Sequence, residues 1–98
     1  MEELKNTGCD EITLVDFGAP WCAPCSLQEP IIRELADKFS GKASIAEVDI
    51  DKNQDMVSIL RIQSIPTLIL FKKGKEIKRF TGLQSEKTLS YVLRRLIK

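Results

Sequence analysis

Residues 12–25 read ITLVDFGAPWCAPC, and this stretch predicts a buried strand that turns directly into a helix. Residues 12–17 are rich in β-forming side chains, and the Gly-Ala-Pro of residues 18–20 ends the strand. The helix begins between two cysteines, Cys22 and Cys25. The pair therefore lies at a strand-to-helix junction.

The chain after this junction continues as alternating helices and strands. Hydrophobic residues follow helical spacing from about residue 24 to residue 39, with Gly41 as the expected end of the helix and a kink at Pro30. Residues 43–49 predict a second strand, and Asp51 is the expected cap of a short helix. The hydrophobic positions of the long helix are Leu27, Ile31, Ile32, Leu35, Ala36 and Phe39.

Both ends of the chain add to this pattern. Residues 67–71 and 77–80 predict a β-hairpin, and Ser85 is the expected cap of a final helix. Residues 1–7 predict a short, weak helix that ends at Gly8. The expected class is α/β, with a central four-stranded mixed sheet and helices on both faces.

Composition limits the possible partners. The 98 residues suffice for one domain, 1–98, and the net charge of +1 favours neither nucleic acid nor a membrane surface. The N-terminus lacks the pattern of a secretory signal, so we expect a cytoplasmic protein. Histidine is absent, which leaves thiols, carboxylates and lysines to carry any chemistry.

Cys22 and Cys25 are the candidate reactive groups. One helical turn places their Cα atoms roughly 5–6 Å apart, a separation that a disulfide can span. Cys22 is expected to have a lowered pKa because free N–H groups and the helix dipole stabilise a thiolate there. It is the predicted nucleophile, and the less accessible Cys25 is the predicted resolving thiol. Pro24 fits the first helical turn and stiffens the loop.

Two other interpretations of the pair remain open. It could form half of a metal site, but a tetrahedral site needs two more ligands, and Cys9 is the one further thiol. A cluster shared between two chains would avoid that difficulty. The cysteines could also be structural residues that are paired by accident.

Beyond the cysteines, the chain resembles the thioredoxin family from Ile12 to Lys98. The motifs that carry the resemblance follow the family's order and spacing: Val15-Asp16-Phe17, Ala19-Pro20-Trp21-Cys22-Ala23-Pro24-Cys25, Pro30, Ile65-Pro66-Thr67, Gly74 and Gly82. The resemblance implies a thioredoxin fold. Because the chain begins late, we expect the family's first strand to be missing and residues 43–49 to form a sheet edge.

The resemblance also implies a surface that binds substrate. Pro66 would follow a cis peptide bond after Ile65 and leave nearby backbone groups free to pair with an extended client segment. Trp21 would shape the approach to Cys22, and Gly82 would keep a groove open beside Pro66. Ala23 and Pro24 would complete this uncharged surface.

A carboxylate behind the cysteines is the next implied functional group. In the family, the acid that matches Asp16 exchanges a proton with the resolving thiol through water. Here Glu47 occupies the position that usually holds a nearby lysine. We expect mutual repulsion and burial to raise the pKa of the coupled pair Asp16 and Glu47.

Other positions depart from the family pattern. Gly18 replaces an aromatic residue, which could affect recognition by a reductase, and Ala23 replaces a glycine. Cys9 has no counterpart and is interpreted as a free or partly buried thiol. The basic residues of the hairpin are interpreted as a solvated surface, with an acidic partner as the alternative: Lys72, Lys73, Lys75, Lys78 and Arg79.

The predicted function is reduction of disulfides in client proteins by a monomeric dithiol carrier. The resemblance implies re-reduction by thioredoxin reductase, with no bound cofactor and no metal. A disulfide oxidase or isomerase would be a close alternative, although those relatives usually carry histidine between the cysteines. A binding module with incidental thiols, or a metal or iron–sulfur protein, would belong to a different class.

Overall fold

The computed structural model describes residues 2–5 and 11–97, and within them the elements follow the order β-β-α-β-α-β-β-α. The strands are β1 (Glu2–Lys5), β2 (Ile12–Gly18), β3 (Ser44–Asp49), β4 (Thr67–Lys72) and β5 (Lys75–Thr81). The helices are α1 (Ala23–Lys38), α2 (Gln54–Leu60) and α3 (Glu86–Ile97), with a 3-10 turn η1 (Ile50–Lys52) before α2.

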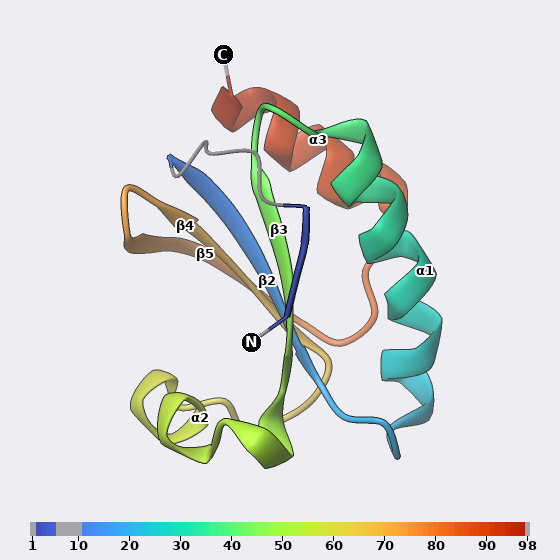
Figure 1. The fold of residues 1–98 in the computed structure, drawn as a ribbon, viewed down its shortest axis with the longest axis vertical. Helices are drawn as coiled ribbons and strands as arrows, with labels where there is room; N and C mark the ends of the chain where they lie inside the picture. Colours follow the sequence, from blue (N-terminus) through green and yellow to red (C-terminus); the bar gives the residue numbers. More distant parts are fainter. Residues whose placement is uncertain (1, 6–10, 98) are drawn as a thin grey trace.

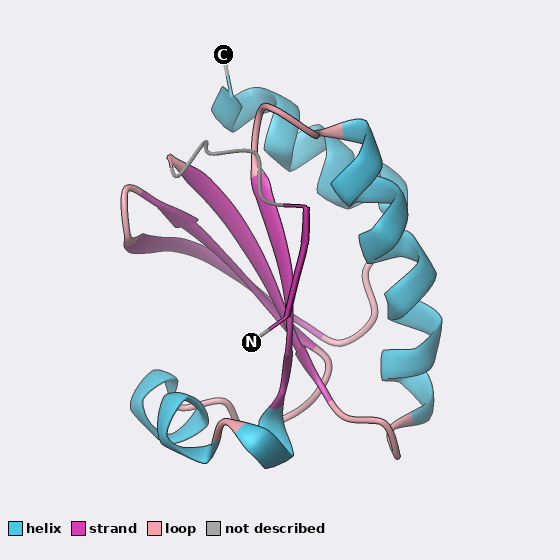
Figure 2. Ribbon diagram, viewed as in Figure 1, coloured by secondary structure: helices cyan, strands magenta, loops and turns pink. Residues whose placement is uncertain are grey.

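The strands form one mixed sheet in the order β1-β3-β2-β4-β5 (Figure 2). β2 and β3 are parallel because α1 connects them as a crossover, whereas β4 is antiparallel to β2 and forms a hairpin with β5. Helices α1 and α3 cover one face and α2 lies on the other (Figure 1). The expected mixed sheet with helices on both faces is confirmed.

The expectation of a missing first strand is wrong. β1 pairs antiparallel with β3, so the described residues form five strands, and residues 2–5 are not helical. β3 is consequently an inner strand rather than a sheet edge. The rest of the expected N-terminal helix lies outside the described residues, as do Gly8 and Cys9.

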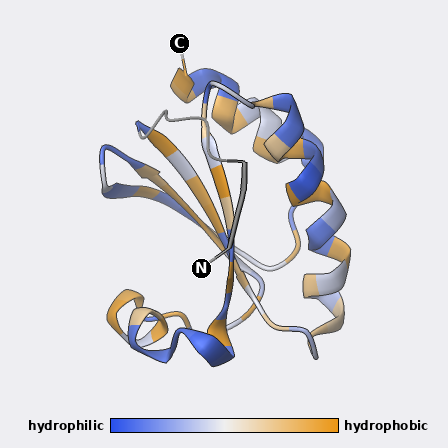
Figure 3. Cartoon of the chain, viewed as in Figure 1, coloured by the Kyte–Doolittle hydropathy of each residue, from blue (hydrophilic) through white to orange (hydrophobic). Residues whose placement is uncertain are grey.

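Two hydrophobic clusters hold the layers together. The larger lies between the sheet and helices α1 and α3, and includes Leu14, Ile32, Leu70 and Leu89. The smaller lies on the α2 face around Phe17, with Val15, Val48 and Ile69. The pattern agrees with Figure 3, in which hydrophobic and hydrophilic residues alternate along α1 and the turn between β4 and β5 is hydrophilic.

Two details of the helices differ from expectation. Asp51 lies inside the 3-10 turn, and the residue that precedes α2 is Asn53 rather than Asp51. In α1, Leu27 is 62% exposed, and the polar Gln28 occupies the buried position beside it. Asp49 caps the 3-10 turn instead, because its carboxylate accepts a hydrogen bond from the Asp51 N–H at 2.9 Å, whereas Asn53 makes no side-chain cap hydrogen bond to α2.

Candidate active site

Four strand ends meet at one end of the sheet. In the strand register, Gly18 at the end of β2 lies opposite Asp49 at the end of β3. Thr67, the first residue of β4, lies opposite both Phe17 and Thr81. The segments that follow or precede these residues therefore gather at the same place, as is typical of functional sites in sheets with parallel strands.

The two cysteines lie at this end, at the start of α1. Cys22 is the N-cap residue and Cys25 lies in the first turn. Pro24 fits this turn because proline has no backbone N–H, and the N–H groups of a first turn have no partner within the helix. Their Cα atoms are 5.2 Å apart and their sulfurs form a disulfide. The backbone N–H of Cys25 points at Cys22 Sγ at 3.3 Å, so the helix N-terminus faces this sulfur as expected.

The two sulfurs face different surroundings, although the residues are almost equally buried, at 7% and 8% exposure. Cys22 Sγ lies 4.0 Å from the carbonyl oxygen of Ile65, and the peptide bond between Ile65 and Pro66 is cis, as the resemblance implied. Cys25 instead lines a cleft on the other side. In this oxidised structure, overall exposure therefore does not distinguish the cysteines, but their neighbours do.

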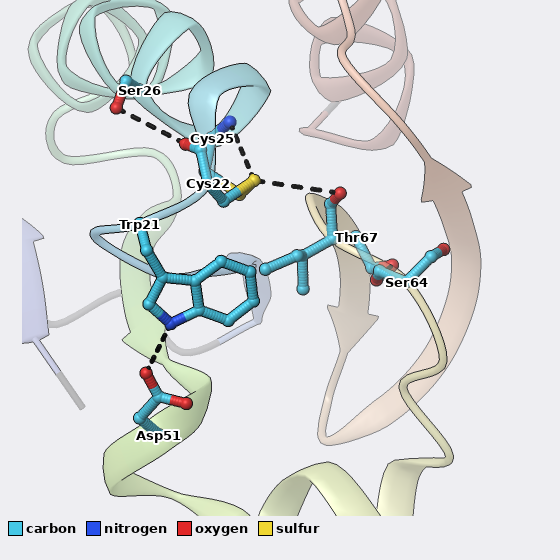
Figure 4. Close-up of a disulfide and its surroundings, with 8 residues drawn as sticks. Trp21, Cys22, Cys25, Ser26, Asp51, Ser64 and Thr67 are labelled. Carbon is cyan, nitrogen blue, oxygen red and sulfur yellow. Dashed lines mark hydrogen bonds between the residues drawn. A yellow bond between two sulfur atoms is a disulfide. The ribbon is translucent and has the colours of Figure 1, made fainter.

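Trp21 stands beside the disulfide on the outer surface (Figure 4). Its side chain is 68% exposed, and its indole Nε1–H donates a hydrogen bond of 2.7 Å to the carboxylate of Asp51. This bond fixes the ring next to Cys22 although the ring is open to solvent. Asp51 is thus a residue of the site that sequence analysis assigned to a helix cap instead.

The cleft behind Cys25 has a volume of about 640 Å³. Gly18 forms part of its wall, and a Cβ atom at Gly18 would lie 3.1 Å from Cys25 Sγ. The absence of a side chain at this position therefore leaves the sulfur open to the cleft. The other lining residues are mostly polar, including Asp16, Ser26, Glu29, Glu47, Asp49, Lys52 and Asn53.

Asp16 is the buried acid of this cleft. It is 5% exposed, and its Oδ1 has no hydrogen-bond partner. Burial, followed by the negative charges of Glu47 and Glu29, raises the pKa of Asp16 from 3.8 to about 7. The expected rise in the pKa of this carboxyl group is confirmed, and Asp16 can therefore exchange protons near neutral pH.

The charges around Asp16 form a small network. Glu47 lies directly opposite Asp16 in the register of β2 and β3. Arg33 approaches both neighbouring carboxylates, at 3.2 Å from Glu29 and 4.0 Å from Glu47. Sequence analysis found Glu47 but missed Glu29, which follows Cys25 by four residues and so lies one helical turn further along α1.

A loop after β5 completes the site. Gly82 adopts a positive φ of 88°, and its N–H donates a hydrogen bond of 2.8 Å to the carbonyl of Pro66. A Cβ at Gly82 would meet no atom within 4 Å, so the space beside it is open. Leu83, the next residue, is a hydrophobic side chain that is 46% exposed.

The described residues also bear on the metal-site and membrane alternatives. No group of three or more Cys, Asp or Glu side chains among residues 2–5 and 11–97 is arranged to hold a metal ion. Within the same ranges, no helix has the length and hydrophobicity to cross a membrane.

A disulfide at a helix N-terminus, beside a cis-proline loop and a buried acid, defines a thiol–disulfide oxidoreductase. The Thioredoxin family model matches residues 2–95. The chain belongs to the thioredoxin family. It is a thioredoxin-type thiol–disulfide oxidoreductase with protein-disulfide reductase activity.

Individual relatives support this assignment. A thioredoxin of Staphylococcus saprophyticus is 40% identical over 82 residues, which cover 84% of this chain and 79% of the relative. A thioredoxin of Staphylococcus haemolyticus is 42% identical with the same coverage. The structure of a mutant thioredoxin from Halobacterium salinarum NRC-1 is similar with a TM-score of 0.85 and 34% identity, covering 91% of this chain and 77% of the other.

Proposed function

We propose that Cys22 is the nucleophile and Cys25 the resolving thiol in the reduction of client disulfides. The Cys22 thiolate attacks one sulfur of the client disulfide, forms a mixed disulfide and releases the other client sulfur as a thiolate. The Cys25 thiolate then attacks Cys22 Sγ, which releases the second client thiolate and leaves the oxidised pair. Two electrons pass from the dithiol to the client.

The observation that carries these roles is the N–H of Cys25 pointing at Cys22 Sγ at the N-terminus of α1. A thiolate at Cys22 would accept this hydrogen bond and would lie at the positive end of the helix dipole. Cys25 has no such position, since it lies inside the first turn. Attack from Cys22 is therefore favoured.

Asp16 is the proposed acceptor of the Cys25 proton. Both residues line the cleft, which is large enough for water, and Oδ1 of Asp16 faces no protein donor. With a pKa of about 7, the carboxylate can take the thiol proton through a water molecule before Cys25 attacks and can return it afterwards. Glu47 acts with Asp16 as a coupled titrating pair.

The proposed client surface surrounds Cys22. Trp21, Ala23 and Pro24 are exposed on one side of this sulfur, and the Ile65–Pro66 segment and Gly82 lie on the other. These residues carry no charge, so they can contact many polypeptides. An extended client segment would pair with backbone groups near Pro66.

Trapping with Cys25→Ser tests these roles. Clients should accumulate as mixed disulfides on Cys22, because the resolving thiol that would release them has been removed. Cys22→Ser, which retains Cys25 but lacks the proposed nucleophile, is the matched control and should trap far fewer clients. Equal trapping by the two variants, or no trapping by Cys25→Ser, would contradict the assignment.

The remaining features of the carrier belong to the same proposal. The family works with disulfide-containing clients and a thioredoxin reductase in general. We propose that residues 1–98 form a single domain that acts as a monomer, without a bound cofactor. The reducing cytoplasm is its proposed location, because the dithiol must be regenerated there after each cycle.

A further inference from the structure

Gln28 is a polar residue in the hydrophobic stripe of α1. It is 0% exposed, follows Cys25 by three residues and precedes the core residue Ile32 by four. A buried amide group is costly unless its donor and its acceptor are both paired. Its partners therefore indicate why a glutamine lies there.

Both ends of the Gln28 amide pair with the backbone of Gln84. The Gln84 N–H donates a hydrogen bond of 2.8 Å to Gln28 Oε1, and Gln28 Nε2 donates one of 3.0 Å to the Gln84 carbonyl. The two residues are 56 positions apart in the sequence. The amide thus joins the active-site helix to the loop between β5 and α3.

This loop reaches the proposed client surface. The side chain of Gln84 donates to the carbonyl of Gly82 at 3.2 Å, and the Gly82 N–H donates to the carbonyl of Pro66 at 2.8 Å. Leu83 lies between the two residues that these bonds fix, and it is 46% exposed. The bonds therefore form a continuous path from Gln28 to Pro66.

We propose that Gln28 is a positioning residue that holds the loop of residues 82–84 in the conformation that polypeptide clients bind. The inference rests on the proposed function, since it concerns the same surface. A loop that is already ordered loses less conformational entropy when a client binds, so the two hydrogen bonds raise client affinity. Gln28 does not act on the chemistry of the cysteines, because its amide is directed at the loop.

The test compares a polypeptide disulfide with a small one. Gln28→Met replaces the amide by a hydrophobic group of similar length. The Gln84 N–H and carbonyl then lose the hydrogen-bond partner that the amide provides. Gln54→Met, the same substitution at an exposed position of α2, is the matched control. The reduced proteins are mixed with increasing insulin, and separately with 5,5′-dithiobis(2-nitrobenzoic acid).

For Gln28→Met, the insulin concentration at half-maximal rate should rise about fivefold, while the limiting rate and the rate with the small disulfide stay within about twofold. Gln54→Met should match the unmodified protein in all three quantities. The inference would be overturned if the rate with the small disulfide fell as much as the rate with insulin, or if the half-saturating insulin concentration stayed unchanged. If the unmodified protein reduced neither substrate, the proposed function itself would fail.

Hydrogen exchange on the unmodified protein gives a test that does not depend on a folded variant. The Gln84 amide should exchange at least about tenfold more slowly than an unprotected amide, because the buried Gln28 Oε1 accepts its proton. In Gln28→Met the protection should disappear at Gln84 and persist at Leu89 in α3. Rapid exchange of the Gln84 amide in the unmodified protein would contradict the proposal.

Discussion

Asp16 should make stability depend on pH in the direction opposite to that of a salt-bridged acid. Its pKa is about 7 in the folded protein and near 3.8 when the chain is unfolded. Between these values the folded state binds the additional proton, so the free energy of unfolding falls as pH rises from about 4 to about 7 and levels off above. Three pKa units correspond to roughly 4 kcal/mol.

Asp16→Asn is therefore expected to stabilise the oxidised protein, by little near pH 4 and by a few kcal/mol at pH 8. Urea unfolding of both proteins across this range measures the difference. Because all other groups are shared, the difference isolates Asp16. A gain that does not change with pH would show that Asp16 has no raised pKa.

Glu47 and Glu29 should contribute unequally to that pKa. Glu47 faces Asp16 across the two parallel strands and is the larger of the two charge effects, so Glu47→Gln should lower the pKa of Asp16 more than Glu29→Gln does. Neither substitution should return the pKa of Asp16 to 3.8, because burial is the main cause of the rise. Carbon-detected NMR of the Asp16 carboxyl group measures both shifts, and the reverse order would contradict the charge arrangement.

Sequence could predict residues whose chemistry is local. Cys22, Cys25 and Asp16 lie within one short stretch; the spacing placed the two cysteines, and the resemblance to the thioredoxin family singled out Asp16. Gln28 could not be found, because its partners are 56 positions away and a glutamine in a helix usually faces water. Its signal was its position: it lies three residues after Cys25 and four before Ile32, on the stripe that Leu27 was expected to join.

At the scale of elements, the first strand shows what local patterns leave out. Residues 2–5 read EELK, which has little β-propensity, and they become a strand because β3 offers an open edge. Pairing of this kind is a tertiary effect. The strongly patterned segments were correctly predicted, because the patterns of β2, α1 and α3 follow from burial of one face or stripe.

The N-terminus of α3 gives an element-scale prediction. Ser85 Oγ accepts a hydrogen bond of 3.1 Å from the Thr88 N–H, as expected for a cap. Ser85→Ala should lower the free energy of unfolding by about 1 kcal/mol, because this N–H loses its partner. Ser58→Ala, at an exposed site inside α2, is the control and should be neutral or slightly stabilising. Equal effects of the two changes in urea unfolding would argue against capping.

On the scale of the whole molecule, topology explains how residues from distant segments form one site. The parallel pair β2 and β3 ends beside the start of β4 and the end of β5, so the cysteines, Asp51, Pro66 and Gly82 converge without any long loop. Helix α1 starts after the end of β2, α2 lies between the end of β3 and the start of β4, and α3 follows the end of β5. Stability and activity therefore depend on the same layers.

The two faces of the sheet should differ in how they tolerate cavities. Leu70 and Ile69 are adjacent in β4 and fully buried, but Leu70 faces the large cluster under α1 and α3, and Ile69 faces the small cluster under α2. Replacement of either by alanine should cost about 2–5 kcal/mol. Leu70→Ala should lie at the upper end, since two packed helices cannot collapse onto the cavity, whereas partly buried residues such as Met56 can move toward Ile69.

Urea unfolding should show one cooperative transition for both variants, with a lower midpoint and an unchanged slope, because the two clusters share every central strand. Ile69→Val and Leu70→Val are the matched smaller truncations and should preserve the same order of effects at the two faces. Two separate transitions would contradict the single cooperative unit, and a larger loss for Ile69→Ala than for Leu70→Ala would mean that the α2 face is the more rigid layer. The cleft behind Cys25 would then be bounded by the less deformable side of the molecule, since Val48 belongs both to that cleft and to the small cluster.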